Sequence, residues 1–476
     1  MLGGMDMTPL DRVLSYLQSR QEAAVAELME FLRIPTISTD EAHQQDMRTA
    51  AAWLRDRLAR AGFEVSRIEE TNGGHPVVRA RYRSREANPS RRRVVVYGHY
   101  DVQPVDPIAA WQYPPFGPEV IDGCLYARGA ADDKGQLYLQ LLAAEAWLKA
   151  TGDIPVDLEF LFEGEEEIGS PHLPEYLESH VDELQADAAV ISDTPMYADD
   201  LPAIVYGLRG LAALEVTVRG PQQDLHSGVY GGIVMNPAVV LTKLLGSLHD
   251  DQGRVQVPGF YDDVMPLDQF DQDVIAKLPF SEVDLMKSIH VSKLSGEKGY
   301  STLERMWLRP TLDAVGMWGG FTSEGMKTVI PAHARAKLSC RLVPDQDPDE
   351  IQRLLVAHLE AQRPLGCRVR ARAVAGVARP YSLPEGYPPL RLAASVLERA
   401  LGGRTLFVRM GGTLPAAELF RRELGAETMF FSFSVSDEHY HAPGEFFRLA
   451  RIEPGARAWF DLVGEIGGAL RRAGSL

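Results

Sequence analysis

The sequence has few cysteines, no long apolar run and no excess of positive charge. The three cysteines are widely separated and form no Cys–x–x–Cys pair, which argues against a disulfide framework and a thiolate zinc site. No apolar stretch approaches the roughly 20 residues of a membrane-spanning helix. The N-terminal segment lacks a basic region followed by an apolar run, so we expect no signal peptide. These absences predict a protein of the reducing cytoplasm with no membrane partner.

Acidic residues outnumber basic ones. The 66 Asp and Glu residues against 49 Lys and Arg residues give a formal net charge of −17. Nucleic acids and anionic membranes are polyanions, so neither is expected as the main partner. Some of the acidic residues are instead expected to be functional, because a site that holds two cations needs several carboxylates.

The length of 476 residues predicts two domains, because a hydrophobic core usually stops growing near roughly 250–300 residues. In the first two hundred residues, short apolar runs alternate with segments of helical periodicity. This alternation predicts an α/β fold with a mostly parallel sheet flanked by helices. The expected strands are 93–97, 156–162 and 188–191, and the expected helices are 9–33, 47–62 and 135–150.

The pattern changes near residue 204. A long alternating segment, 204–218, is predicted as one strand. The later segments predict a small α+β sandwich with an antiparallel sheet and helices on one face. Its other expected elements are a helix at 236–249, a strand at 334–342, a helix at 349–362 and a strand at 368–374. The irregular segment 251–310 predicts no defined element.

After Pro380 the helix–strand alternation returns, with elements expected at 390–401, 406–408 and 429–433 and a C-terminal helix from about Glu445. We therefore predict one α/β domain formed by residues 1–204 and 381–476. Residues 205–380 are predicted to form a second domain inserted into the first.

Five short segments carry candidate metal ligands, and four of them follow a predicted strand. In open α/β sheets ligands bind beyond the carboxyl ends of the strands, so these loops can converge. The segments are 98–101, 128–135, 163–170, 192–193 and 437–445. Each alone has a simpler structural interpretation: a polar pair for His99 and Asp101, a helix cap for Asp132 or Asp133, and a turn residue for Asp193.

Taken together, the segments indicate a site for two metal ions. They supply two imidazoles and three carboxylates, the set expected for a pair of Zn²⁺ or Mn²⁺ ions. Adjacent carboxylates such as Asp132 and Asp133 repel each other unless a cation or a helix N-terminus compensates. The run of glutamates at 163–167 can supply one metal ligand and a neighbour that stays free as a base.

Several motifs in the same order resemble the M20 family of binuclear metallopeptidases, specifically its dipeptidase branch of cytosolic and carnosine-type dipeptidases. The resemblance runs over nearly the whole chain. The motifs include YGHYDVQP (97–104), ARGAADDKG (127–135), EGEEEIGS (163–170), DLHSGVYGG (224–232) and HAPGE (441–445). The resemblance implies an enzyme that hydrolyses dipeptides or very short peptides with two divalent ions per subunit, Zn²⁺ preferred and Mn²⁺ the alternative.

The resemblance also assigns roles around the metals. His99 and Asp193 bind one ion, Glu167 and His441 bind the other, and Asp132 bridges the two through a cis bond to Asp133. Asp101 orients His99, and Glu166 is the general base that activates the water.

Outside the metals, the resemblance implies that His226 donates to the developing oxyanion in the active site of a neighbouring subunit. The protein would then be a homodimer formed through the inserted domain, which also acts as a lid. By itself, His226 is equally consistent with a buried turn histidine. Arg341 is expected to bind the free carboxylate of the substrate, and Thr328 and Thr413 to line the substrate pocket.

Two departures from the family pattern lie near the end of the chain. Gly444 stands where an asparagine is common, and we expect it to loosen the loop without removing the ligand. His439 lies two residues before His441, so the choice of His441 as the ligand rests on the Ala–Pro that follows it.

Two other functions are consistent with the same residues. An N-acyl amino acid amidohydrolase would use the same metals and base, although in the family an aspartate at position 193 goes with peptidases. A non-catalytic, metal-stabilised binding protein needs the ligands but no free base beside them. Glu166, next to Glu167, is the residue that distinguishes an enzyme from such a protein.

Overall fold

The computed structural model describes residues 7–85, 92–362 and 364–473. We expect no signal peptide in the N-terminal segment, and the first six residues of that segment lie outside the described residues. The chain divides into two compact units. The first contains Met1–Tyr206, Leu383–Val408 and Leu414–Leu476, and the second contains Gly207–Ser382 and Arg409–Thr413. None of the described helices is both long and apolar enough to cross a bilayer.

The first unit is built on a six-stranded sheet with the order β1-β2-β6-β3-β7-β17. Strands β6, β3, β7 and β17 run parallel, while β2 pairs antiparallel with both of its neighbours, β1 and β6. The bounds are β1 (Glu64–Glu69), β2 (Val77–Tyr82), β3 (Arg93–His99), β6 (Asp157–Glu163), β7 (Ala188–Ile191) and β17 (Glu427–Phe430). The predicted mostly parallel sheet is therefore confirmed.

Helices cover both faces of this sheet. The ring of Tyr97 on β3 contacts Phe420 of α13 (Pro415–Leu424) with centroids 5.4 Å apart. The next residue, Gly98, faces Leu137 of α3 (Lys134–Thr151). Because successive strand residues point to opposite faces, α3 and α13 lie on opposite sides of the sheet. Most of β3 and all of β6 and β7 are buried, which explains their nearly continuous apolar runs.

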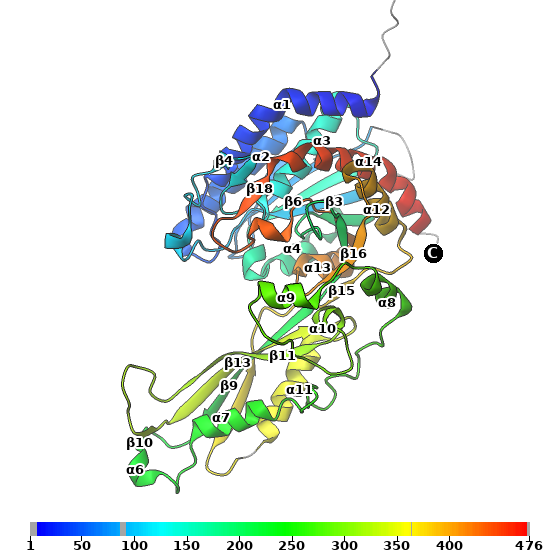
Figure 1. Cartoon of the computed structure of the whole chain (residues 1–476). Helices are drawn as coiled ribbons and strands as arrows, with labels where there is room; N and C mark the ends of the chain where they lie inside the picture. Colours follow the sequence, from blue (N-terminus) through cyan, green and yellow to red (C-terminus); the bar gives the residue numbers. More distant parts are fainter. Residues whose placement is uncertain (1–6, 86–91, 363, 474–476) are drawn as a thin grey trace, which may run out of the picture. The chain divides into compact units, whose positions relative to one another are not determined.

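Helix α3 is buried along most of its length because two other helices pack on it. These are α1 (Pro9–Leu32) and α14 (Ile452–Ala473), and α12 (Pro388–Leu401) packs in turn on α14 (Figure 1). A capping box fixes the start of α1, in which Thr8 Oγ1 accepts from Asp11 N at 3.1 Å and Asp11 Oδ2 accepts from Thr8 N at 3.0 Å. Helix α2 (Gln44–Ala61) also contacts α3, whereas the short helices α4 (Leu173–Ser179) and α5 (Val181–Leu184) contact α13.

The second unit contains a four-stranded antiparallel sheet with the order β11-β13-β9-β14. Burial alternates along β9, and its buried residues Leu214, Val216 and Val218 belong to one apolar core. Helices α7 (Pro237–Gly246) and α11 (Pro348–Ala361) pack on this sheet and close the core. The predicted α+β arrangement is thus confirmed. The strands are β9 (Gly210–Arg219), β11 (Thr311–Gly319), β13 (His333–Leu342) and β14 (Arg368–Ala373).

Two expectations about individual elements were wrong. The segment 204–218 is not one strand but two, β8 (Ala203–Leu208) and β9, because the chain changes sheet at Arg209: β8 joins β15 (Tyr381–Ser382) and β16 (Leu406–Met410). The C-terminal helix begins at Ile452 rather than near Glu445, because β18 (Phe446–Arg448) first pairs with β5 (Cys124–Tyr126) beside β4 (Glu119–Ile121).

The segment 251–310 also contains regular structure. Helices α8 (Gln269–Ala276), α9 (Glu282–Ser288) and α10 (Thr302–Trp307) lie there. Each begins after an N-cap residue, Asp268, Ser281 or Ser301, whose side-chain oxygen accepts from a backbone N–H of the first turn. These caps were visible in the sequence, but helices this short carry too little periodicity to be recognised.

Candidate metal centre

The predicted metal ligands meet where the parallel strands end. His99 is the last residue of β3, and Asp193 follows β7 by two residues. Glu166 and Glu167 lie in a 3₁₀ turn, η3 (Glu166–Ile168), that follows β6. The remaining two ligands, Asp132 before α3 and His441 beyond β17, come to the same edge of the sheet.

Six side chains form two adjacent groups with metal-binding geometry. His99, Glu166 and Asp193 make one group and Asp132, Glu167 and His441 the other, with the ligand atoms of each group within 4.8 Å of one another. Asp132 joins the two groups. Its Oδ1 lies 3.1 Å from Nε2 of His99, and its Oδ2 lies 2.9 Å from Nε2 of His441. The Asp132–Asp133 peptide bond is cis.

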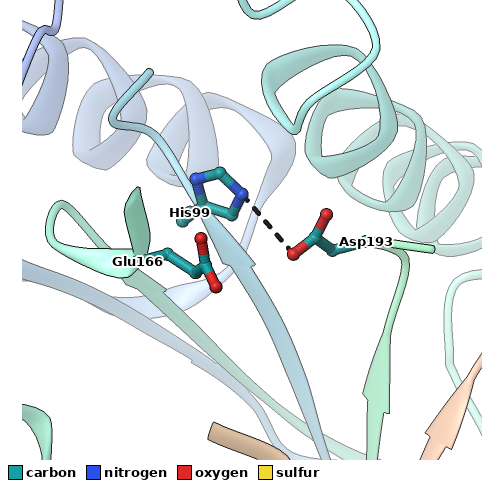
Figure 2. Close-up of side chains that lie close together, drawn as sticks. All are labelled: His99, Glu166 and Asp193. Carbon is teal, nitrogen blue, oxygen red and sulfur yellow. Dashed lines mark ion pairs between the residues drawn. The ribbon is translucent and has the colours of Figure 1, made fainter. Parts of the chain in front are cut away.

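His99 directs one ring nitrogen toward Asp193, as Figure 2 shows, and its other ring nitrogen lies against Asp101. Nδ1 lies 3.2 Å from the carbonyl oxygen of Asp101 and 3.3 Å from its Oδ1. Nε2 lies 3.6 Å from Oδ2 of Asp193, yet it is buried and forms no hydrogen bond with any described residue. A buried nitrogen without a hydrogen bond, aimed at carboxylates, fits a metal ligand whose second nitrogen is held by an acceptor.

Asp101 has a second contact that the sequence did not indicate. Its Oδ1 accepts from the backbone N–H of Glu166 at 3.2 Å, and its Oδ2 accepts from that of Glu167 at 3.1 Å. The same carboxylate therefore fixes the His99 ring and the backbone of the two adjacent glutamates.

The glutamates of the run 163–167 have different surroundings. Glu163 accepts from the hydroxyls of Tyr97 and Ser170, and Glu165 accepts from His75 N at 3.0 Å. Glu167 accepts from Nε2 of Gln103 at 2.7 Å. Among the described residues, none donates a hydrogen bond to the carboxylate of Glu166. Gln103 was not predicted, although it lies in the same motif as His99.

The electrostatics of the site favour positive charge. Hydrogen bonds to Asp132 and Glu167 raise the pKa of His441 to about 11. Burial raises the pKa of Glu166 well above its ordinary value, and the nearby carboxylates of Asp193 and Glu167 add to this rise. Carboxylates crowded together away from water are stabilised by cations.

The other predicted residues lie in the second unit. His226 ends the short strand β10 (Leu225–His226) and is exposed, not buried, and its Nδ1 accepts from Gly228 N at 3.0 Å. Strand β10 pairs with β12 (Val329–Ile330), and the carbonyl of Thr328 accepts from Ser227 N at 3.0 Å, so Thr328 is next to the histidine turn.

Arg341 and Thr413 contact each other in the same unit. Nη1 of Arg341, on β13, donates to Oγ1 of Thr413 at 3.0 Å. That hydroxyl in turn donates to the carbonyl of Arg209 at 2.7 Å. The Thr413 hydroxyl therefore links the Arg341 side chain to the backbone of Arg209. The Arg341 guanidinium is held in place by an uncharged partner.

In the loop that carries His441, the neighbouring His439 belongs to neither ligand group. His439 packs its ring against Phe446 at 5.9 Å between centroids. Gly444 has a φ of 83°, in the left-handed region that glycine and asparagine adopt with little strain. Glycine thus suits the conformation of this turn, and the looser loop expected from Gly444 stays a prediction.

The donor set fits a pair of divalent ions. It consists of carboxylate oxygens and imidazole nitrogens, with the Asp132 carboxylate directed to both groups, and it includes no thiolate. An α/β sheet with such a site beyond its strand ends defines the protein as a metallohydrolase of the binuclear type.

The comparison with known proteins places this metallohydrolase in a family. The profile of the peptidase family M20/M25/M40 matches residues 95–465. The chain belongs to this family, and it is therefore an enzyme of the peptidase class.

Relatives share nearly the whole chain. Beta-Ala-His dipeptidase of Homo sapiens is 30% identical over 452 residues, which cover 92% of this chain and 88% of that protein. The structure of the di-peptidase Dug1p from Saccharomyces cerevisiae has a TM-score of 0.81 at 28% identity and covers 96% of this chain and 99% of its own. That of the M20 metallo-carboxypeptidase Sso-CP2 from Sulfolobus solfataricus has a TM-score of 0.82 at 30% identity, covering 93% and 98%.

Proposed function

We propose that this protein is a metallo-dipeptidase that cuts dipeptides or very short peptides beside a free terminus. One observation carries the proposal: Glu166, whose carboxylate accepts no hydrogen bond from the described residues, lies among the ligand atoms beside Glu167. A purely structural metal site would close its coordination and would need no such free base. The relatives named as dipeptidases support the substrate class.

The chemistry would be divided between the ions and this chain. When bound, the two ions polarise the scissile carbonyl and make a water molecule acidic. Glu166 takes a proton on its carboxylate from that water and later delivers it to the leaving amine. Asp101 keeps the proton of His99 on Nδ1 and holds the backbone of Glu166 in place. His99, Asp132, Glu167, Asp193 and His441 would hold the ions.

The second unit would bind the substrate. The fork of Arg341 suits a free carboxylate, and its contact with Thr413 limits the directions in which it can point. Thr328 would line the pocket next to His226. His226 would donate to the oxyanion in the active site of a partner subunit, and its exposure is consistent with that role.

We further propose a homodimer formed through the second unit. Strand β11 is at the edge of its sheet and exposes three large apolar side chains: Val315 is 65% exposed, Met317 60% and Trp318 40%. An exposed edge strand with apolar side chains favours association with a second copy. Sedimentation of the protein would show a dimer if this holds and a monomer if it does not.

Zinc is proposed as the preferred ion and manganese as the alternative, because both take imidazole and carboxylate ligands. A cytoplasmic location is proposed from Cys124, Cys340 and Cys367, which are all free thiols. Fractionation of cells that express the protein would test the location.

The decisive experiment uses apoprotein refilled with zinc or manganese alone. Each form is assayed on a panel of dipeptides and on N-acetyl amino acids of matched side chains. We expect faster hydrolysis of the dipeptides. Preference for the N-acetyl compounds would instead identify an amidohydrolase, and metal binding without either activity would identify a binding protein.

A further inference from the structure

Glu445 closes the motif that carries His441, but it belongs to neither ligand group. It is fully buried, and its carboxylate accepts four hydrogen bonds, all from the loop before α3. Oε2 accepts from Arg128 Nη1 at 2.7 Å and from Gly129 N at 2.9 Å. Oε1 accepts from Ala131 N at 2.9 Å and from Asp132 N at 3.1 Å.

The loop 128–132 has no side-chain acceptors of its own between Arg128 and Asp132. Between Arg128 and Asp132 it consists of glycine and alanine, so its side chains offer no acceptor for the buried N–H groups. Buried backbone donors need partners, and one carboxylate supplies partners for three of them. The backbone carbonyl of Glu445 also accepts from Ala127 N at 3.1 Å. A single residue from the C-terminal part of the chain, Glu445, therefore holds this loop through hydrogen bonds to its backbone.

Arg128 holds the carboxylate in place. Its guanidinium lies over the ring of Trp111 at 5.1 Å, and its Nη2 donates to the carbonyl of Pro104 at 3.2 Å. Both members of the Arg128–Glu445 pair are buried. Such a pair is costly to break, because the remaining charge loses its partner away from water.

We propose that Glu445 is a positioning residue for both metal sites. One oxygen holds the backbone of Asp132, which faces both imidazoles, and the segment of Glu445 itself carries His441. The residue touches neither the ions nor the substrate. Its carboxylate instead sets the distance between the loop of the bridging ligand and the loop of the last imidazole.

The proposal rests on the proposed metal centre and is tested by metal affinity. Glu445→Gln keeps the size of the side chain but turns an amide donor toward N–H groups that are also donors. Glu159→Gln is the matched control: Glu159 is also buried, and it accepts from Arg79 and Arg81 at 2.6–3.0 Å but contacts no ligand. Zinc affinity is measured by competition with a chelating dye, and melting temperature is measured with and without zinc.

Both variants are expected to melt at lower temperature than the wild type. Only Glu445→Gln should lose zinc affinity, by roughly 10–100-fold, as when partners of metal ligands are removed elsewhere. Equal affinity in Glu445→Gln and the wild type would overturn the proposal, as would an equal loss in Glu159→Gln. If Glu445→Gln does not fold, Glu445→Asp, one methylene too short to reach the whole loop, should show a smaller loss, and unchanged affinity there would also overturn it. A wild type that binds no zinc would instead refute the metal centre itself.

Discussion

Oδ2 of Asp132 lies 2.9 Å from Nε2 of His441, although the two residues are far apart in the sequence. Its other oxygen is turned to His99, at 3.1 Å. Each oxygen of the Asp132 carboxylate faces a different imidazole, so loss of this carboxylate removes a ligand from both metal sites. The two ions are therefore expected to depend on it together.

Asp132→Ala should remove both ions, whereas His441→Ala should remove mainly one. Metal analysis after dialysis should find close to zero ions per subunit in the first variant and about one in the second, because each site needs its own ligands to keep an ion. Circular dichroism would verify that both variants are folded. One ion retained in Asp132→Ala would show that the aspartate does not bridge.

Glu166→Gln should bind zinc nearly as the wild type does and yet turn over roughly 10²–10⁴-fold more slowly, because the amide cannot take the proton. Single-turnover rates and metal content are measured on the same preparation. Glu165→Gln is the control from the same run, since Glu165 accepts from His75 and faces His172 instead of the metal ligands. Loss of zinc in Glu166→Gln would reassign Glu166 as a ligand.

The convergence of the ligand loops could be predicted because its cause is local. Apolar runs that end in His99, in the glutamates after 163 and in Asp193 mark the carboxyl ends of parallel strands, which share one edge. The second contact of Asp101 and the contact of Glu445 with the 128–132 loop could not be predicted. They join side chains to backbone groups that are distant in sequence, and such contacts leave no periodic pattern.

The break between β8 and β9 was missed for a related reason. Apolar residues continue on both sides of Arg209, so the sequence shows one long strand. What changes is the environment: all of β8 is buried, whereas β9 is buried on one face. The sheet that a strand joins depends on its partners, which the local sequence does not specify.

Arg341→Ala should lower kcat/KM by about 10–100-fold, mainly through KM, because a charge-assisted hydrogen bond to the substrate carboxylate is lost. The loss should disappear with substrates whose terminal carboxylate is amidated. Arg335→Ala, on the same strand, is the control. An equal loss on amidated and free substrates would mean that Arg341 does not bind the carboxylate.

Gly444→Ala should destabilise the protein by roughly 1–2 kcal/mol, because an alanine resists the left-handed backbone conformation. Space is not the reason, since an added Cβ would meet its nearest neighbour, Nδ1 of His439, at 3.5 Å. Gly444→Asn should be nearly neutral, because asparagine tolerates this conformation. Urea unfolding of the three proteins measures the difference, and equal stability of the alanine and asparagine variants would contradict it.

His226→Ala should lower turnover by roughly 10²–10³-fold with unchanged metal content, as when an oxyanion donor is removed. If the histidine acts in the partner's active site, mixing this variant with Glu166→Gln should restore activity. In a heterodimer of the two, one site has both defects and the other has none. Random exchange in an equal mixture should therefore leave about a quarter of all sites intact, given two-fold symmetry.

A mixture of His226→Ala with His333→Ala, an exposed histidine of the same unit, separates exchange from complementation. His333→Ala is expected to be active alone, and random exchange leaves half of all sites intact in that mixture, so its activity should stay constant while that of the Glu166→Gln mixture rises. No recovery in the Glu166→Gln mixture, after exchange has been shown by a tagged subunit, would place His226 in its own subunit's site or outside catalysis. Turnover of His226→Ala alone distinguishes these two outcomes, and its metal content shows whether the histidine instead supports the metal centre.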